Sequence, residues 1–378
     1  MIRKIIAIAE LIGLHHANAE LLHSSESAAG QTKAQSAVTS LEQRASLWEA
    51  ICATDRNFSL MLNFPAGTAR YPFPRNESMY REGVISPQAY NFRLSKICTA
   101  IFEIDESYMH GSPLAESYEK VLGADRQLRA LAAEAPKGWW HDSDHRSVAE
   151  LLVQFWHFYF LARVHLRPGI LGKADEQYAY NSSACVEACR NAVLRFPNIR
   201  LRIPIGFFVC RVLDLQVFTA ATFLLLSERS RYLVSQSESP NTATDMERIK
   251  LVQQVIDCFA SVSERAGSDL AHEAKAALER ILELVQHPDA RHQEPLTLQI
   301  PLLGKITLGR NVHSATSRSD MDSNENLELA SDYDHPGSTS ESAFDPLSWS
   351  FDFDSPSLLN EMLGMNFWTA VDQESVIP

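Results

Sequence analysis

The sequence predicts an all-α protein: a multi-helix bundle followed by a disordered, acidic C-terminal tail. Apolar residues recur at helical spacing from the N-terminus to Gln286. The segment from Ser147 to Leu166 is apolar nearly all round, which is typical of a helix at the centre of a bundle. After Gly309 the periodicity stops, and Ser, Asp, Asn and Gly dominate as far as Asp345, which predicts disorder.

The N-terminus has two interpretations. Ile2, Ile5, Ile6, Ala9 and Ile12 fall on one helical stripe, which predicts a first helix. A basic start, an apolar run and a small-x-small site also imitate a secretory signal. Glu10 counts against the signal, because a carboxylate inside such a run costs roughly 2–3 kcal/mol on insertion.

The segment 24–40 is rich in Ser, Ala, Gln, Thr and Gly and reads as a loop. A helix is expected from Leu41 to Asn63, with Pro65 stopping it. Ser86 is a good N-cap with a proline at the first helical position, and Gly111 closes that helix. Loops are expected at 65–85 and 227–244, and a weak strand candidate at 296–308. The other expected helices are 113–133, 147–166 (ended by Arg167-Pro168-Gly169), 177–196, 204–226, 245–264 and 268–286.

Charge divides the chain into a neutral body and an acidic tail. Residues 320–378 contain 13 Asp and Glu and neither Lys nor Arg. The whole chain holds 47 acids, so removing these 13 leaves 34 acids against 34 Lys and Arg. A body without net positive charge is expected to bind DNA phosphates weakly, because Lys and Arg supply most of a protein's affinity for the DNA backbone.

Cysteines and catalytic motifs give no enzyme signal. The six cysteines are scattered singly, apart from the pair Cys185 and Cys189, which predicts packing in a reducing compartment rather than a disulfide framework. Tetrahedral zinc needs four ligands, and no partner pair is evident for these two. The sequence has neither a Gly-rich phosphate loop nor a G-x-S-x-G elbow. We therefore expect no enzyme activity, no cofactor and no metal.

One segment resembles the signature of the fungal-specific transcription factor domain, the middle homology region of fungal zinc-cluster regulators. The family segment reads roughly R-x-x-L-W-W, a spacer, D-R, then S-x-x-L-G-R-P. Glu49 stands for the second Trp, and Asn63-Phe64 for Gly-Arg. Later pieces resemble the family's L-H-R-P and S-x-x-x-C-x-x-A-A segments. The matching residues are Arg44, Leu47, Trp48, Asp55, Arg56, Ser59, Leu62, Pro65, His165, Arg167, Pro168 and Cys185.

The resemblance implies a structural role for these residues. We expect Leu47, Ile51 and Phe58 to point to the core. Asp55 and Arg56 project about 100° apart on a helix, so each should pair with another element or cap a loop. The family's DNA-binding module needs six cysteines within about thirty residues, whereas those of this chain run from Cys52 to Cys258, so the chain lacks that site.

The tail interleaves acids with large apolar residues, as acidic activation segments do. Repulsion between carboxylates keeps aromatics in water, available to a coactivator groove, and Leu358 to Leu363 could form a short helix on docking. The alternative is a tail that folds back on the bundle. The candidate activation residues are Phe344, Leu347, Trp349, Phe351, Phe353, Leu358, Leu359, Leu363, Phe367 and Trp368.

These observations predict three parts: a helical regulatory domain at 1–308, a disordered linker at 309–343 and a candidate transactivation segment at 344–378. The predicted function is nuclear transcription regulation of a pathway or metabolite gene cluster. It would act through coactivators or other transcription factors, such as a zinc-cluster partner, without direct DNA binding or a membrane. The alternative is a secreted or enzymatic helical protein with an N-terminal signal peptide.

Overall fold

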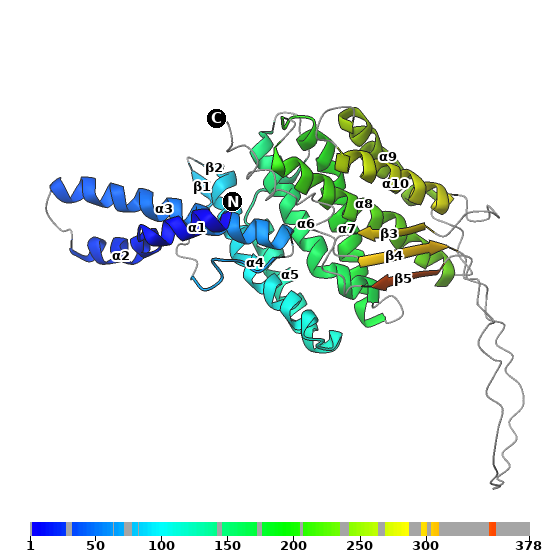
Figure 1. Ribbon diagram of the computed structural model, residues 1–378, viewed down its shortest axis with the longest axis horizontal. Coiled ribbons are helices and arrows are strands. Elements are labelled where there is room, and N and C mark those ends of the chain that lie inside the picture. The colour runs from blue at the N-terminus through cyan, green and yellow to red at the C-terminus, as the bar shows by residue number, and fades with distance from the viewer. Residues whose placement is uncertain are drawn as a thin grey trace, which may run out of the picture.

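The computed structural model describes residues 2–27, 32–62, 64–71, 78–81, 83–141, 146–171, 176–204, 207–234, 242–263, 269–286, 296–300, 304–309 and 348–352. Its helices are α1 (Ile2–Leu11), α2 (Ala17–Ser27), α3 (Thr32–Met61), α4 (Pro87–Met109), α5 (Leu114–Ala133), α6 (Val148–Leu171), α7 (Ala179–Arg200), α8 (Phe208–Val234), α9 (Thr242–Ser263) and α10 (Asp269–Gln286). Short 3-10 turns are η1 (Leu14–His16), η2 (Lys137–Trp140) and η4 (Glu176–Tyr178). The predicted all-α class is confirmed (Figure 1).

Two small sheets accompany the helices. Strands β1 (Tyr80–Arg81) and β2 (Val84–Ile85) form a hairpin before α4. Strands β3 (Leu296–Ile300) and β4 (Gly304–Gly309) form a second hairpin, at the position of the strand candidate. Strand β5 (Ser348–Asp352) pairs antiparallel with β4.

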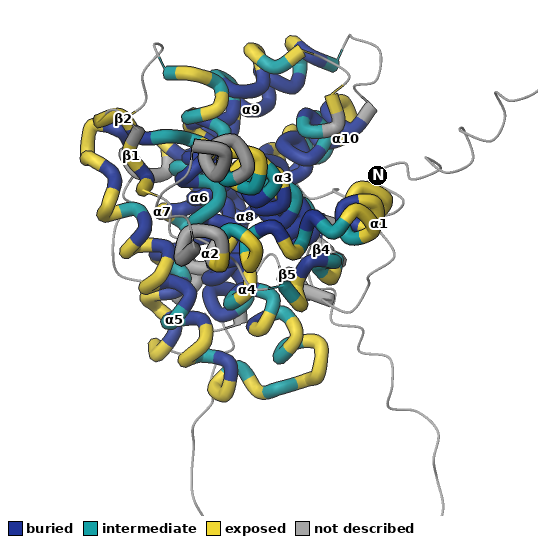
Figure 2. Tube along the Cα trace, turned by 90° about the vertical axis from the view of Figure 1, so that its left-hand side faces the viewer, coloured by how far each residue is buried: buried dark blue, intermediate teal, exposed yellow. Residues whose placement is uncertain are grey.

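The main core lies between α4, α5, α6, α7, α8, α9 and α10, and the end of α3 also contributes to it. The prediction for α6 is confirmed: its residues from Leu151 to Leu166 are almost all buried, and it packs mainly on α7. In α8, the apolar stretch Val209–Ser227 is long enough to cross a membrane, but 89% of it is buried inside the bundle, as in the core helix of a soluble protein. Figure 2 shows the buried residues gathered toward the middle, with exposed ones on the outer faces of α1 and α5.

Local signals explain several helix boundaries. Ser86 caps α4 as predicted, because its Oγ accepts a hydrogen bond from the Ala89 backbone N–H. The same helix ends before Gly111, whose φ of 70° is a left-handed conformation that favours glycine. At the start of α6, Ser147 and Glu150 form a capping box in which each side chain accepts from the other residue's backbone N–H.

Three boundary predictions are wrong. Residues 32–40 continue α3 instead of forming a loop, since their Ala, Lys and Gln are good helix formers and α3 packs along α2. Pro168 does not end α6, which runs on to Leu171 and buries Ile170. Gly169 explains the close approach of α6 to α7, because a Cβ there would lie 3.2 Å from the Ser182 Cα. The predicted loop at 227–244 is likewise shorter, with α8 reaching Val234 and α9 starting at Thr242.

Candidate functional site

The signature segment occupies the second half of α3 and the turn that follows it. Trp48, Asp55, Arg56, Ser59 and Leu62 are buried there, as expected of structural residues. Arg44 is partly exposed, and its Nη1 lies 3.3 Å from Glu20 Oε2 on α2. Pro65 is exposed, and its carbonyl accepts a hydrogen bond from Arg3 on α1. The segment thus connects α1, α2 and the turn.

Asp55 and Arg56 hold this turn from two sides. Asp55 is fully buried, and its Oδ2 accepts hydrogen bonds from the backbone N–H and the Oγ1 of Thr68, both at 2.8 Å. Arg56 Nη2 donates to the carbonyls of Thr68 (3.2 Å) and Tyr71 (2.6 Å). Of the two expected roles, pairing with another element or capping a loop, the structure shows the second, because both side chains bind the backbone of the same turn.

Trp48 is the centre of a small second core, and Leu47 is not part of it. Trp48 is 2% exposed and packs with Ala9, Leu14 and Cys52. Its ring meets that of Tyr71 edge-on, with 5.0 Å between centroids. The prediction that Leu47 points to the core is wrong, since its side chain is 54% exposed. Adjacent helical residues project about 100° apart, so the helix face that buries Trp48 turns Leu47 outward.

The later signature residues lie around a buried polar network between α5, α6 and α7. His165 Nε2 lies 2.9 Å from Asp125 Oδ1, and Tyr180 donates to Asp125 Oδ2 at 2.8 Å. Burial by itself raises the pKa of Asp125, but the hydrogen bonds from His165 and Tyr180 outweigh it and hold that pKa at about 2. Pro168 and Cys185 are buried nearby on α6 and α7, and Arg167 stacks over the Tyr108 ring.

The His165–Asp125 pair resembles the His–Asp part of a catalytic triad, but its hydrogen-bond partners join α5, α6 and α7 to one another. The other ring nitrogen, Nδ1, lies 3.2 Å from the Asn181 amide nitrogen. With Asn181 as donor there, Nε2 carries the proton and donates to Asp125, so the ring has no lone pair left to activate a nucleophile. Sequence reasoning missed Asp125 and Asn181, because residues forty and sixteen positions from His165 meet it only across helices.

The cysteines are buried, reduced thiols. Burial raises the pKa of the Cys52 and Cys258 thiols to about 12, which leaves both protonated and inert at neutral pH. Cys185 and Cys189 pack at the contact between α6 and α7. Within the described ranges, no group of three or more His, Cys, Asp and Glu is arranged to hold a metal ion.

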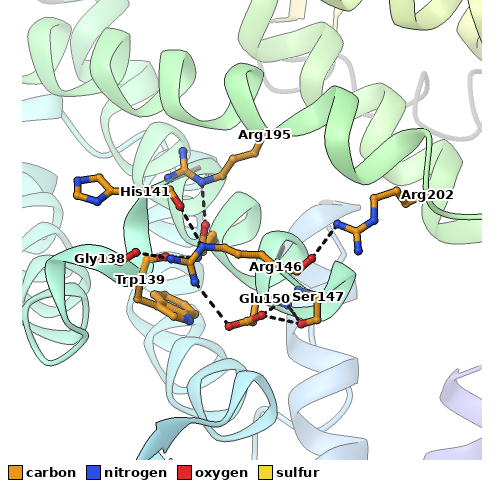
Figure 3. Close-up of polar contacts among 9 residues, drawn as sticks. Gly138, Trp139, His141, Arg146, Ser147, Glu150, Arg195 and Arg202 are labelled. Carbon is orange, nitrogen blue, oxygen red and sulfur yellow. Dashed lines mark hydrogen bonds and ion pairs between the residues drawn. The ribbon is translucent and has the colours of Figure 1, made fainter. Parts of the chain in front are cut away.

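A cluster of three arginines, Arg146, Arg195 and Arg202, lies beside the turn η2 (Figure 3). Arg146 donates to the carbonyls of Gly138 and His141, and Arg202 donates to the Arg146 carbonyl at 2.8 Å. Arg195 is buried, and its guanidinium donates to the Trp140 carbonyl. These guanidinium groups donate to backbone carbonyls, and Arg146 Nη1 also lies 3.6 Å from Glu150 Oε1, so the cluster holds η2 and its buried Trp139 in place.

Part of the candidate activation segment is in the structure. Trp349 and Phe351 lie in β5, where the register places Trp349 opposite Leu308 and Phe351 opposite Ile306. Within the tail, Ser348–Asp352 form strand β5, whose backbone pairs with β4. The other candidates lie outside the described residues: Phe344, Leu347, Phe353, Leu358, Leu359, Leu363, Phe367 and Trp368.

Comparison with known proteins points to fungal transcription regulators. The chain is 24% identical over 292 residues to the transcription factor sdnS of Sordaria araneosa, covering 71% of this chain and 37% of that protein. It is 25% identical over 202 residues to the dehydrocurvularin biosynthesis regulator of Aspergillus terreus, with 49% and 26% covered. The transcription factor eupR of a Phoma species is 27% identical over 182 residues, with 43% and 34% covered.

These relatives are named as regulators rather than enzymes, and the chain is related to them. The chain spans between 26% and 37% of the length of these three proteins. No family model matches the chain, and no solved structure matches it.

Proposed function

We propose that this protein is a nuclear transcription regulator of the fungal zinc-cluster class that controls a biosynthetic gene cluster. The observation that carries the proposal is its similarity, over 71% of its length, to a fungal transcription factor. A relative named as a biosynthesis regulator supports the kind of target. The helical body would serve as the regulatory region, because its buried polar groups are engaged in holding turns and helices together.

In this proposal the regulator reaches DNA through a partner protein. The six cysteines are buried at separate places in the body, so they cannot form the compact zinc cluster of this class. The body carries 34 acids and 34 bases, which gives it no net attraction for phosphates. The purified chain should therefore bind no zinc and show no specific DNA affinity. Two zinc ions per chain, or a saturable specific shift of DNA at physiological salt, would refute this.

The acidic and aromatic tail would contact coactivators. Residues 340–378, fused to an unrelated DNA-binding domain, should activate a reporter. Changing Trp349, Phe351 and Phe353 together to Ala should abolish activation, because each apolar side chain contributes roughly 1.5–3 kcal/mol when fully buried in a partner. Changing Asp352 and Asp354 to Asn should only weaken it, because the acids mainly raise the encounter rate.

A well-expressed nuclear fusion that stays silent would contradict activation. It would favour a body that represses or sequesters a zinc-cluster partner. Tagging both ends of the full chain separates nuclear regulation from the secreted alternative, which requires signal in the medium and loss of the N-terminal tag. The packing of α1 favours the nuclear outcome, because Ile6 and Ala9 are buried against the body and α1 packs on α3.

A further inference from the structure

The register of the three-stranded sheet β3–β4–β5 groups apolar residues at one set of alternating positions and polar residues at the other. In the hairpin, Leu296 pairs with Leu308, Leu298 with Ile306 and Ile300 with Gly304. Residues directly opposite each other share a face, and alternate residues along a strand change face. Leu296, Leu298, Ile300, Ile306 and Leu308 therefore lie on one face, whereas Thr297, Gln299, Lys305 and Thr307 lie on the other.

Strand β5 continues the same alternation, because its apolar residues pair with apolar residues of β4 and its polar residues with polar ones. Trp349 pairs with Leu308 and Phe351 with Ile306, which places the two aromatics on the apolar face. Ser350 pairs with Thr307 and Asp352 with Lys305, so two residues of opposite charge occupy directly paired register positions. A slip of one residue would reverse every one of these placements, so the sequence specifies this register.

We propose that β4 masks the activation segment by pairing with Ser348–Asp352, which contains Trp349 and Phe351, as the third strand of this sheet. The proposal rests on the proposed function, because Trp349 and Phe351 are the residues assigned to coactivator binding. A backbone paired with β4 cannot also form a helix or enter a coactivator groove, so docking requires β5 to leave the sheet. Because both strands belong to one chain, a coactivator competes with an effective concentration on the order of millimolar.

The test compares two fusions to an unrelated DNA-binding domain: the full chain and residues 340–378. The isolated tail should activate the reporter, and the full chain at matched expression should be several-fold weaker. Ser350→Pro should raise the full-chain signal toward that of the tail, because proline locks φ at about −65°, far from the roughly −140° of an antiparallel strand. The same change in the isolated tail should leave activity within twofold, and Ser350→Ala should leave both fusions unchanged.

A charge exchange tests the register from the side of β4. Lys305→Glu puts two carboxylates opposite each other, which should weaken pairing by about 1.5- to 5-fold and raise full-chain activity accordingly. Adding Asp352→Lys should restore masking, with the isolated tail carrying Asp352→Lys as the reference for any direct effect. Lys305 lies outside the tail, whereas Asp352 contributes to the encounter rate with the coactivator, so each full-chain variant is compared with the isolated tail that carries the same residue at position 352.

A cross-link tests the contact itself. In the purified full chain, Thr307→Cys with Ser350→Cys should form a disulfide under oxidised glutathione, because directly opposed residues lie within bridging distance. The control pair, Thr307→Cys with Asp352→Cys, is two residues out of register and should bridge far less. Two results would overturn the masking and leave the activation function standing. One is a full chain that activates the reporter as strongly as the isolated tail, and the other is equal disulfide formation in the two cysteine pairs. A silent tail fusion would overturn the activation function, and the masking with it.

Discussion

Trp48 and Leu47 are neighbours in the signature segment, yet the structure assigns them opposite roles. Trp48 is 2% exposed, whereas Leu47 is 54% exposed. Replacing each residue by Ala should therefore lower the free energy of unfolding strongly at Trp48 and only slightly at Leu47. Both replacements keep a good helix former at the position, so a difference between them reports on packing.

The magnitude follows from the burial of the ring. A tryptophan buries about 150–250 Å², which corresponds to about 4–6 kcal/mol at about 25 cal/mol per Å². The unfolded chain already buries part of that area, so we expect Trp48→Ala to cost about 3–5 kcal/mol. The edge-on contact with Tyr71 is included in this loss. Leu47→Ala should cost less than about 1 kcal/mol.

Urea denaturation followed by far-ultraviolet circular dichroism measures both values on the full chain. Because Trp48 joins α1, η1 and the turn at Tyr71 to α3, its loss should also release α1. Hydrogen exchange in residues 2–16 should then rise in Trp48→Ala and stay unchanged in Leu47→Ala. Equal losses of stability in the two variants would refute the assignment of Trp48 to this second core.

Two further predictions concern buried charges. Arg200 Nε lies 2.8 Å from Asp214 Oδ1, and both side chains are 3% exposed. Arg200→Met alone should cost about 3–5 kcal/mol, whereas Arg200→Met with Asp214→Leu should recover most of that loss, because the second change removes the orphaned charge. Urea midpoints of the wild type and the two variants test this, and a double variant as unstable as the single one would contradict it. Burial, reinforced by Arg195 and Arg129, lowers the pKa of His157 to about 3. The unfolded imidazole gains a proton near pH 6.5 while the folded one stays neutral, so stability should fall as the pH drops from 6.5 toward 3, by up to about 1.4 kcal/mol per pH unit. His157→Gln should flatten this slope, and an unchanged slope would exclude His157 as its source.

Periodicity and local signals in the sequence determined most of the helical framework. The Ser86 cap, the end of α4 before Gly111 and the central place of α6 are short-range or compositional effects, and such effects can be read from neighbouring residues. The same local reading failed at residues 32–40 and at Pro168. At 32–40, the helix propensity of Ala, Lys and Gln together with the contact of α3 with α2 favoured a helix, and at Pro168 the contacts of α6 with α7 outweighed the local stop signal.

Only the tertiary structure decided which polar and charged residues meet. Asp55 with Thr68, Asp125 with His165 and Arg200 with Asp214 each join separate elements. A buried charge is stable only beside its partner, yet a single chain does not reveal partners that are distant in sequence. The tail follows the same rule: its composition indicates an activation segment, and its pairing with β4 depends on a strand that ends 39 positions before β5 begins.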